Sequence, residues 1–352
     1  MRSFPSFYDP RRIGSLYHPD LAAIAADAGQ AGLAPAANDA LSVQCVLIDM
    51  QIDFCHAGGS LNVPGALADI RRLVEFIYQH AEHLTSFICT LDSHLPYQIF
   101  HPHWWADPQG AHPAPFTLIS AEDVEAGRWR PLVAPEYSRH YVRQLEAQAK
   151  KVLTIWPYHV LMGGLGNALD PVLWSAVMWH ALARKSQPTW WVKGTVPQTE
   201  NYSAIQPEIL APEHPQGGRN AALINALSRA DYVLVAGEAE SHCVLETLED
   251  LVEAWRGQPK KLERLYVLRD CMSPVVHPQV DFHALALDQF KKFEQLGVRF
   301  IDTRTAAAEL PFLAGPERAV SHSDAPVVGL QRQGEWQAEN QALADLERAN
   351  LG

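Results

Sequence analysis

Short runs of apolar residues alternate with longer amphipathic segments along much of the chain. The runs at 43–48, 85–91, 189–192, 232–236, 262–268 and 298–301 have the length and composition of buried strands. The segments at 66–82, 136–151, 170–185, 244–255 and 281–296 carry apolar residues at helical spacing. Strand, helix and strand in this order predict parallel pairing, so we expect an α/β fold with a mostly parallel sheet. Ligands of such sheets bind beyond the carboxyl ends of the strands.

Three segments fall outside this pattern. Residues 1–40 precede the first strand and include an alanine-rich stretch at 21–37 that predicts a loose helix. We interpret them as an extension that caps the domain or a partner subunit. Residues 95–150 are rich in Pro, Trp and His and show little periodicity before Glu136, which indicates an insert. One main domain is therefore expected at 41–305, and the weakly patterned residues 306–352 are expected to form a tail.

The charge and the cysteine content exclude several classes of protein. The 352 residues have a formal net charge of -12, which argues against nucleic acid or an anionic membrane as a partner. The 5 cysteines are scattered and odd in number, so we expect no disulfide framework and a reducing, cytoplasmic location. The N-terminus lacks the apolar stretch of a secretory signal, and no run of about 18 apolar residues predicts a membrane span.

Four reactive side chains come at or soon after the ends of predicted strands: Asp49, Asp92, Lys193 and Cys243. One edge of the sheet would therefore hold all of them. Cys243 also lies near a predicted helix N-terminus, where free N–H groups favour a thiolate and the oxyanion of an acyl-transfer intermediate. A carboxylate base and an ammonium beside this thiol would activate it as a nucleophile. Taken alone, the stretch fits a buried structural cysteine equally well, and we interpret the neighbouring His242 as a surface residue.

A second group of residues has the donor atoms of a metal site. Asp92 and His94 are two positions apart and would face the same side of a continued strand, with His159 as a third ligand. His101 and His103 are nearby alternatives. Their surroundings, rich in aromatics and prolines, favour a polar loop over a role as ligands.

The same residues belong to four motifs that occur in a fixed order between about 43 and 303. The motifs are Leu47-Ile48-Asp49-Met50-Gln51-Ile52-Asp53-Phe54 with Gly58-Gly59-Ser60-Leu61 and Val63-Pro64-Gly65; Thr90-Leu91-Asp92-Ser93-His94; Trp156-Pro157-Tyr158-His159 with Gly163-Gly164-Leu165-Gly166; and Lys193-Gly194 and Tyr202-Ser203 with Gly237-Glu238-Ala239-Glu240-Ser241-His242-Cys243-Val244. Taken together, they resemble the motifs of the nicotinamidases, within the isochorismatase-like cysteine hydrolases.

This resemblance implies a doubly wound sheet with helices on both faces and a catalytic triad of Asp49, Lys193 and Cys243. It also implies a cis peptide bond between Glu238 and Ala239. The N–H groups of Ala239 and Cys243 would form the oxyanion hole.

The resemblance further assigns Asp92, His94 and His159 to one divalent metal ion, usually zinc, iron or manganese in this family. It places Phe54 and Trp156 beside the ring of the substrate. Isochorismatases and several other branches lack the metal-binding trio, so its presence favours a nicotinamidase. Such an enzyme hydrolyses nicotinamide to nicotinate and ammonia, a step of NAD salvage and pyridine nucleotide synthesis.

The insert and the two extensions depart from the compact family pattern. They would remodel the mouth of the pocket or form a subunit interface, and we expect a homo-oligomer that binds a small-molecule amide. A fourth metal ligand found in some members would fall near His101, but the spacing does not match and we do not assign it. Three alternatives stay open: an amidase for another heteroaromatic or small amide, a non-heme iron oxygenase, and a catalytically inactive binding protein.

Overall fold

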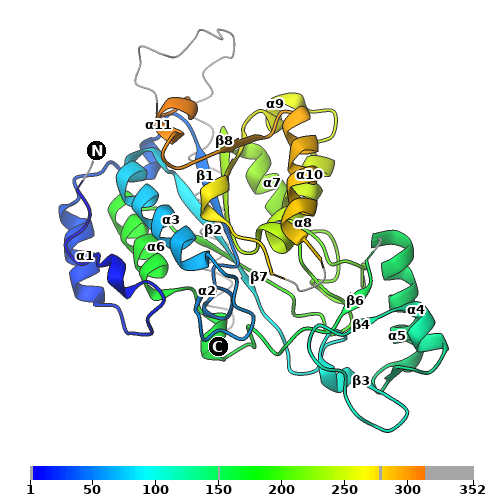
Figure 1. Cartoon of the computed structure of the whole chain (residues 1–352). Helices are drawn as coiled ribbons and strands as arrows, with labels where there is room; N and C mark the ends of the chain where they lie inside the picture. The colour runs from blue at the N-terminus through cyan, green and yellow to red at the C-terminus, as the bar shows by residue number, and fades with distance from the viewer. Residues whose placement is uncertain (1–2, 150, 277–279, 314–352) are drawn as a thin grey trace, which may run out of the picture. The chain divides into compact units, whose positions relative to one another are not determined.

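The computed structural model describes residues 3–149, 151–276 and 280–313, and within them six strands form one parallel sheet (Figure 1). The sheet order is β10-β9-β8-β1-β2-β7. The strands are β1 (Val43–Ile48), β2 (Ser86–Asp92), β7 (Thr189–Lys193), β8 (Tyr232–Gly237), β9 (Leu265–Leu268) and β10 (Arg299–Ile301). All neighbouring pairs are parallel. The predicted α/β fold is therefore confirmed.

Helices cover both faces of this sheet (Figure 1). One face packs against α1 (Leu21–Gln30), α3 (Ala66–His80) and α6 (Pro171–Arg184), and the other against α7 (Ala221–Arg229), α8 (Leu245–Ala254) and α10 (Phe282–Gln295). Alternate residues of a strand point to opposite faces. Accordingly, Cys45 and Leu47 of β1 join the first core, whereas Val46 and Ile48 join the second.

Polar residues set the ends of several helices where the sequence predicts them. Asp170 caps α6 by accepting hydrogen bonds from the N–H groups of Val172 at 2.8 Å and Leu173 at 3.2 Å. Pro171 occupies the first helical position, where a missing N–H costs nothing. Asp281 caps α10 in the same way, through the N–H of Ala284 at 3.0 Å.

Other boundaries differ from the prediction. The helix expected at 21–37 ends at Gln30, and Pro35 begins a separate turn. The strand expected at 262–268 is shortened by α9 (Pro259–Leu262), and the helix around Cys243 begins with a π-helical turn, Glu240–Val244. Helices α2 (Ile52–Cys55) and α7 were not predicted. Of the predicted tail, the structure describes only the part with α11 (Ala306–Glu309), and residues 314–352 lie outside the described residues.

The insert forms a small core of its own. It contains β3 (Trp105–Ala106) paired with β5 (Arg130–Pro131), β4 (Leu118–Ile119) paired with β6 (Leu153–Thr154), α4 (Ala121–Glu125) and α5 (Pro135–Gln144). The core includes Phe100, Trp105, Tyr141 and Ile155, together with Trp156. Since Trp156 belongs to a predicted site motif, the insert reaches the functional edge of the sheet.

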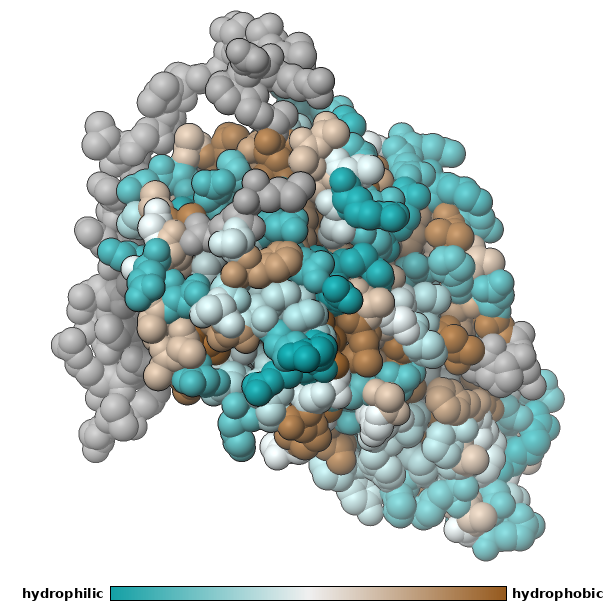
Figure 2. Space-filling view, turned by 60° about the vertical axis from the view of Figure 1, so that its left-hand side comes forward, coloured by the Kyte–Doolittle hydropathy of each residue, from teal (hydrophilic) through white to brown (hydrophobic). Residues whose placement is uncertain are grey.

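The N-terminal segment packs on α6. Ile24 and Ala28 are buried in the same core as α6, and Trp179 of α6 donates its indole N–H to Asp27 at 2.8 Å. Figure 2 shows hydrophobic side chains in several separate groups among polar ones on the face it displays. Across the described residues, no helix has both the length and the apolar character needed to span a bilayer.

Candidate active site

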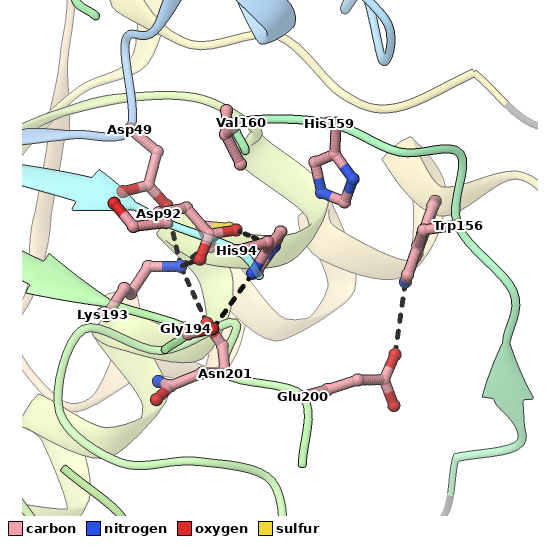
Figure 3. Close-up of polar contacts among 12 residues, drawn as sticks. Asp49, Asp92, His94, Trp156, His159, Val160, Lys193, Gly194, Glu200 and Asn201 are labelled. Carbon is pink, nitrogen blue, oxygen red and sulfur yellow. Dashed lines mark hydrogen bonds and ion pairs between the residues drawn. The ribbon is translucent and has the colours of Figure 1, made fainter. Parts of the chain in front are cut away.

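The carboxyl ends of β1, β2 and β7 bring the predicted reactive residues together (Figure 3). Asp49 follows β1, Asp92 ends β2, and Lys193 ends β7. Cys243 lies in the π-helical turn that follows β8. All four are buried, so their charges interact through protein rather than through bulk water.

Lys193 lies at the centre of this group. Its Nζ is 3.0 Å from Asp49 Oδ2, 3.2 Å from Asp92 Oδ1 and 3.8 Å from Cys243 Sγ. It also donates to the carbonyl oxygen of Asn201 at 2.7 Å. Burial lowers the pKa of Lys193, but Asp49 and Asp92 outweigh it and raise the pKa above its usual value. The ammonium therefore stays charged and lies within reach of the thiol.

Asp49 is held by Thr90, which belongs to the motif before His94 but had no predicted role. Thr90 Oγ1 donates to Asp49 Oδ1 at 2.6 Å and accepts from the backbone N–H of Asp49 at 3.0 Å. Burial raises the pKa of Asp49, and Lys193 opposes that shift. A carboxyl with a raised pKa exchanges protons more readily near neutral pH.

Burial also raises the pKa of the Cys243 thiol well above its usual value. Lys193 opposes this shift in pKa, and Asp49 adds to it. The resting thiol is therefore neutral and needs a base before it can attack. The peptide bond between Glu238 and Ala239 is cis, as the resemblance implies. Gly237, before it, has a φ of 141°, and a Cβ atom there would lie 2.1 Å from the carbonyl oxygen of Ile48. Only glycine allows this close approach to β1.

The three predicted metal ligands also lie together. Potential ligand atoms of Asp92, His94 and His159 are all within 4.8 Å of one another. His94 Nε2 is 3.0 Å from Asp92 Oδ2, while its Nδ1 is 3.1 Å from the carbonyl oxygen of Gly194. His159 Nδ1 is 2.7 Å from the carbonyl oxygen of Pro157. An Nδ1–H bonded to a carbonyl leaves Nε2 of each ring as a free ligand.

This donor set fits a divalent metal ion, because one carboxylate and two neutral imidazoles are common ligands of zinc and iron. Burial raises the pKa of Asp92, but His94 and Lys193 more than reverse this, so the carboxylate is ionised. Burial lowers the pKa of His159 to about 3, which keeps that ring neutral. Gly194 borders the cluster: a Cβ atom there would lie 2.3 Å from Asp92 Oδ1 and 2.8 Å from His94 Cε1.

A cavity of about 40 Å³ lies between the thiol and the three ligands. The aromatic side chains of Phe54 and Trp156, both predicted to flank the substrate, line it. The Phe54 ring lies 5.5 Å from the ring of His159, centroid to centroid.

A buried carboxylate fixes the orientation of Trp156 (Figure 3). Trp156 Nε1 donates to Glu200 Oε1 at 3.2 Å and to the hydroxyl of Tyr202 at 2.9 Å. The Tyr202 hydroxyl donates to Glu200 Oε1 at 2.5 Å, and the hydroxyl of Tyr141, from the insert, donates to Glu200 Oε2 at 3.2 Å. Sequence analysis did not identify Glu200 or Tyr141, because neither belongs to a motif.

Two interpretations of histidines are wrong. His242 is not merely a surface residue, because it lines the cavity with its ring 5.6 Å from that of Trp156. His101 is fully buried rather than part of a polar loop, and within the described part of the chain its Nε2 has no hydrogen-bond partner. Its ring lies 6.0 Å from that of His94. His103 is exposed, as expected.

No protein-family model and no curated protein sequence matches the chain. Solved structures do. A yeast nicotinamidase bound to the inhibitor nicotinaldehyde is 16% identical, covers 74% of this chain and 99% of its own, and has a TM-score of 0.50. An Acinetobacter baumanii nicotinamidase and pyrazinamidase is 20% identical over 76% of this chain and 99% of its own, with a TM-score of 0.49.

A third structure is the pyrazinamidase of Pyrococcus horikoshii in complex with zinc. It is 18% identical over 74% of this chain and 99% of its own, with a TM-score of 0.44. At such identities, the likeness to the yeast structure shows only that the chain shares the α/β fold of that nicotinamidase.

Proposed function

We propose that the chain is a metal-dependent cysteine amidohydrolase that converts nicotinamide to nicotinate and ammonia through a thioester on Cys243. One observation carries the proposal. Lys193 Nζ lies 3.0 Å from Asp49 and 3.8 Å from the Cys243 thiol, directly beside the cluster of Asp92, His94 and His159. A neutral thiol, a buried carboxylate and a fixed ammonium are the parts that nucleophilic attack on an amide requires.

Asp49 acts first as the base in this scheme. It takes the proton of the Cys243 thiol, and the Lys193 ammonium stabilises the thiolate that forms. The sulfur attacks the amide carbon to give a tetrahedral intermediate. Asp49 then returns the proton to the amide nitrogen, the C–N bond breaks, and ammonia leaves.

The backbone N–H groups of Ala239 and Cys243 stabilise the negative oxygen of the intermediate. Cys243 is the fourth residue of its helical turn, so its N–H is among those that bonds within the helix leave unused. Each such donor typically contributes a factor of about 10²–10³ to the rate. Water then attacks the thioester while Asp49 accepts a proton. The C–S bond breaks, Asp49 returns the proton to the Cys243 sulfur, and nicotinate leaves.

Asp92, His94 and His159 would hold a zinc, iron or manganese ion. An ion held there would supply a Lewis acid for a ring nitrogen of the substrate. Phe54 and Trp156 pack on the ring.

A related amidase for another heteroaromatic amide is the second candidate. Its support is the wall of the cavity, where Trp156 donates to Glu200 and Tyr141 of the insert donates to the other oxygen of the same carboxylate. An insert that orients a substrate-facing ring changes which rings fit. The cytoplasmic location and a homo-oligomer remain predictions.

The test is ammonia release from nicotinamide by purified protein, with and without a chelator, beside a panel of heteroaromatic and aliphatic amides. Nicotinamide is expected to be hydrolysed with the highest kcat/KM, and chelation is expected to stop it. A better amide on the panel would support the second candidate. Failure of every amide, with an intact metal site, would overturn both.

A further inference from the structure

Glu238 brings a carboxyl group into the loop that carries the nucleophile. It precedes Ala239, so the peptide unit whose N–H is proposed to hold the oxyanion begins at Glu238. Its side chain is fully buried. Oε2 accepts from the backbone N–H of Ser273 at 3.2 Å, but among the described residues Oε1 has no partner. Buried carboxylate oxygens are rarely left without a partner.

Asp69 of helix α3 is the neighbour to which we attribute the missing partner of Glu238 Oε1. It is also buried, and its Oδ2 accepts from Ser273 Oγ at 2.5 Å while Oδ1 pairs with Arg72. Gly65 leaves room for the contact, since a Cβ atom there would lie 2.3 Å from Ser273 Oγ. One serine therefore bonds both carboxyl groups and brings α3 up to the loop.

The electrostatics of the pair indicate a single shared proton. Burial raises the pKa of Glu238 well above its usual range, and Asp69 raises it further. Burial also raises the pKa of Asp69, whereas the hydroxyl of Ser273 and the neighbouring Glu238 carboxyl lower it. Opposite effects of this kind arise when one carboxyl donates and the other accepts.

Among the residues that the structure describes, the groups around the pair do not supply a second positive charge. Those that face it are Cys55 of α2, Asp69 and Arg72 of α3, Glu240 of the nucleophile turn, Asp270 and Cys271 before Ser273, and His283 of α10, which bonds Glu240 at 2.7 Å. Arg72 balances Asp69 and is shared with Asp270. An ionised Glu238 would have no cation of its own.

We propose that Glu238 is a protonated positioning residue whose Oε1–H donates to the Asp69 carboxylate and thereby fixes the peptide unit that presents the Ala239 N–H to the oxyanion. The inference rests on the proposed thioester function. Ser273 completes the clamp, because its carbonyl oxygen accepts from the Glu240 N–H at 2.8 Å. The clamp fixes the oxyanion donor from outside the cavity and does not touch the substrate.

Three variants test this role. Glu238→Gln keeps a neutral donor of the same shape, so its kcat should stay within about threefold of the wild type. Glu238→Ala removes the donor, so kcat should fall by about 10–100-fold with little change in KM, as for a misplaced oxyanion donor. Glu240→Gln changes a carboxyl two residues further along the same loop and is the matched control, with kcat within about threefold.

A readout that does not depend on activity comes from infrared difference spectra at neutral pH. The wild type should show the carbonyl stretch of a protonated buried carboxyl, and Glu238→Gln should lack it. Absence of that band in the wild type overturns the proposal even if Glu238→Ala fails to fold. A Glu238→Gln enzyme as slow as Glu238→Ala also overturns it. If the wild type hydrolyses no amide but shows the band, only the proposed function fails.

Discussion

The floor and the wall of the cavity are built in different ways. The floor consists of Asp92 and Cys243, which line the cavity, and of Asp49 and Lys193, which are buried beside them; each lies at or just beyond the end of a strand in the parallel sheet. The wall consists of Trp156, Glu200 and Tyr202, which line the cavity, and of Tyr141 behind them; it is held by the packing of the insert and by one buried carboxylate. Since the sheet places the reacting groups and the insert places an aromatic ring, changes to the floor should stop the chemistry. Changes to the wall should alter the fit of the substrate.

The largest effect is expected at the nucleophile. Replacing Cys243 with alanine removes the attacking atom, so turnover should fall by at least about 10⁴-fold. Ammonia release measures it. Cys45→Ala, a change to a cysteine buried in the sheet core, is the control and should keep its kcat. Undiminished turnover by Cys243→Ala would exclude the thioester route.

Loss of a metal ligand should come next. His159→Ala is expected to lower bound metal and to reduce kcat/KM by about 100-fold, because the ring nitrogen of the substrate loses its anchor. Metal content by atomic absorption and ammonia release are measured together. His140→Ala, an exposed histidine of α5, serves as the control. Equal metal content in the His159→Ala and wild-type proteins would show that His159 is not a metal ligand.

The raised pKa of Asp49 predicts the acid side of the pH profile. Asp49 must be ionised to take the thiol proton, so kcat/KM should rise with pH through the pKa of this group. Because burial raises that pKa, the half-maximal point should lie above the ordinary carboxyl range. Rates of nicotinamide hydrolysis across pH measure it. A half-maximal point at the usual aspartate value would contradict Asp49 as the base.

The smallest effect is expected in the wall. Tyr141→Phe removes a hydroxyl that donates to Glu200 Oε2 and accepts from the Glu200 N–H at 3.0 Å. KM should rise by about fivefold while kcat changes little, the size of one typical intramolecular hydrogen bond. Tyr137→Phe is matched, because in the described structure the Tyr137 hydroxyl has no partner. A fall in kcat without a rise in KM would contradict the separate roles of the wall and the floor.

The floor was predictable from sequence, and the wall was not, for a physical reason. Apolar runs followed at once by Asp49, Asp92 or Lys193 predict residues at one edge of a parallel sheet, since strand polarity fixes where the ends meet. Glu200 and Tyr141 meet through side-chain packing between segments 59 residues apart, and no local pattern encodes that contact. The burial of His101 and the place of His242 in the cavity were missed for the same reason.

Gly194 has a consequence for how the two halves of the site respond to change. It follows Lys193 directly, its carbonyl oxygen lies 3.1 Å from the His94 ring, and it has no room for a side chain. The backbone of Lys193 and Gly194 thus links the Lys193 ammonium to His94, a proposed metal ligand. Any movement that loosens the ion should therefore shift the ammonium too, so the apo protein is expected to be less reactive at its thiol as well as weaker in binding.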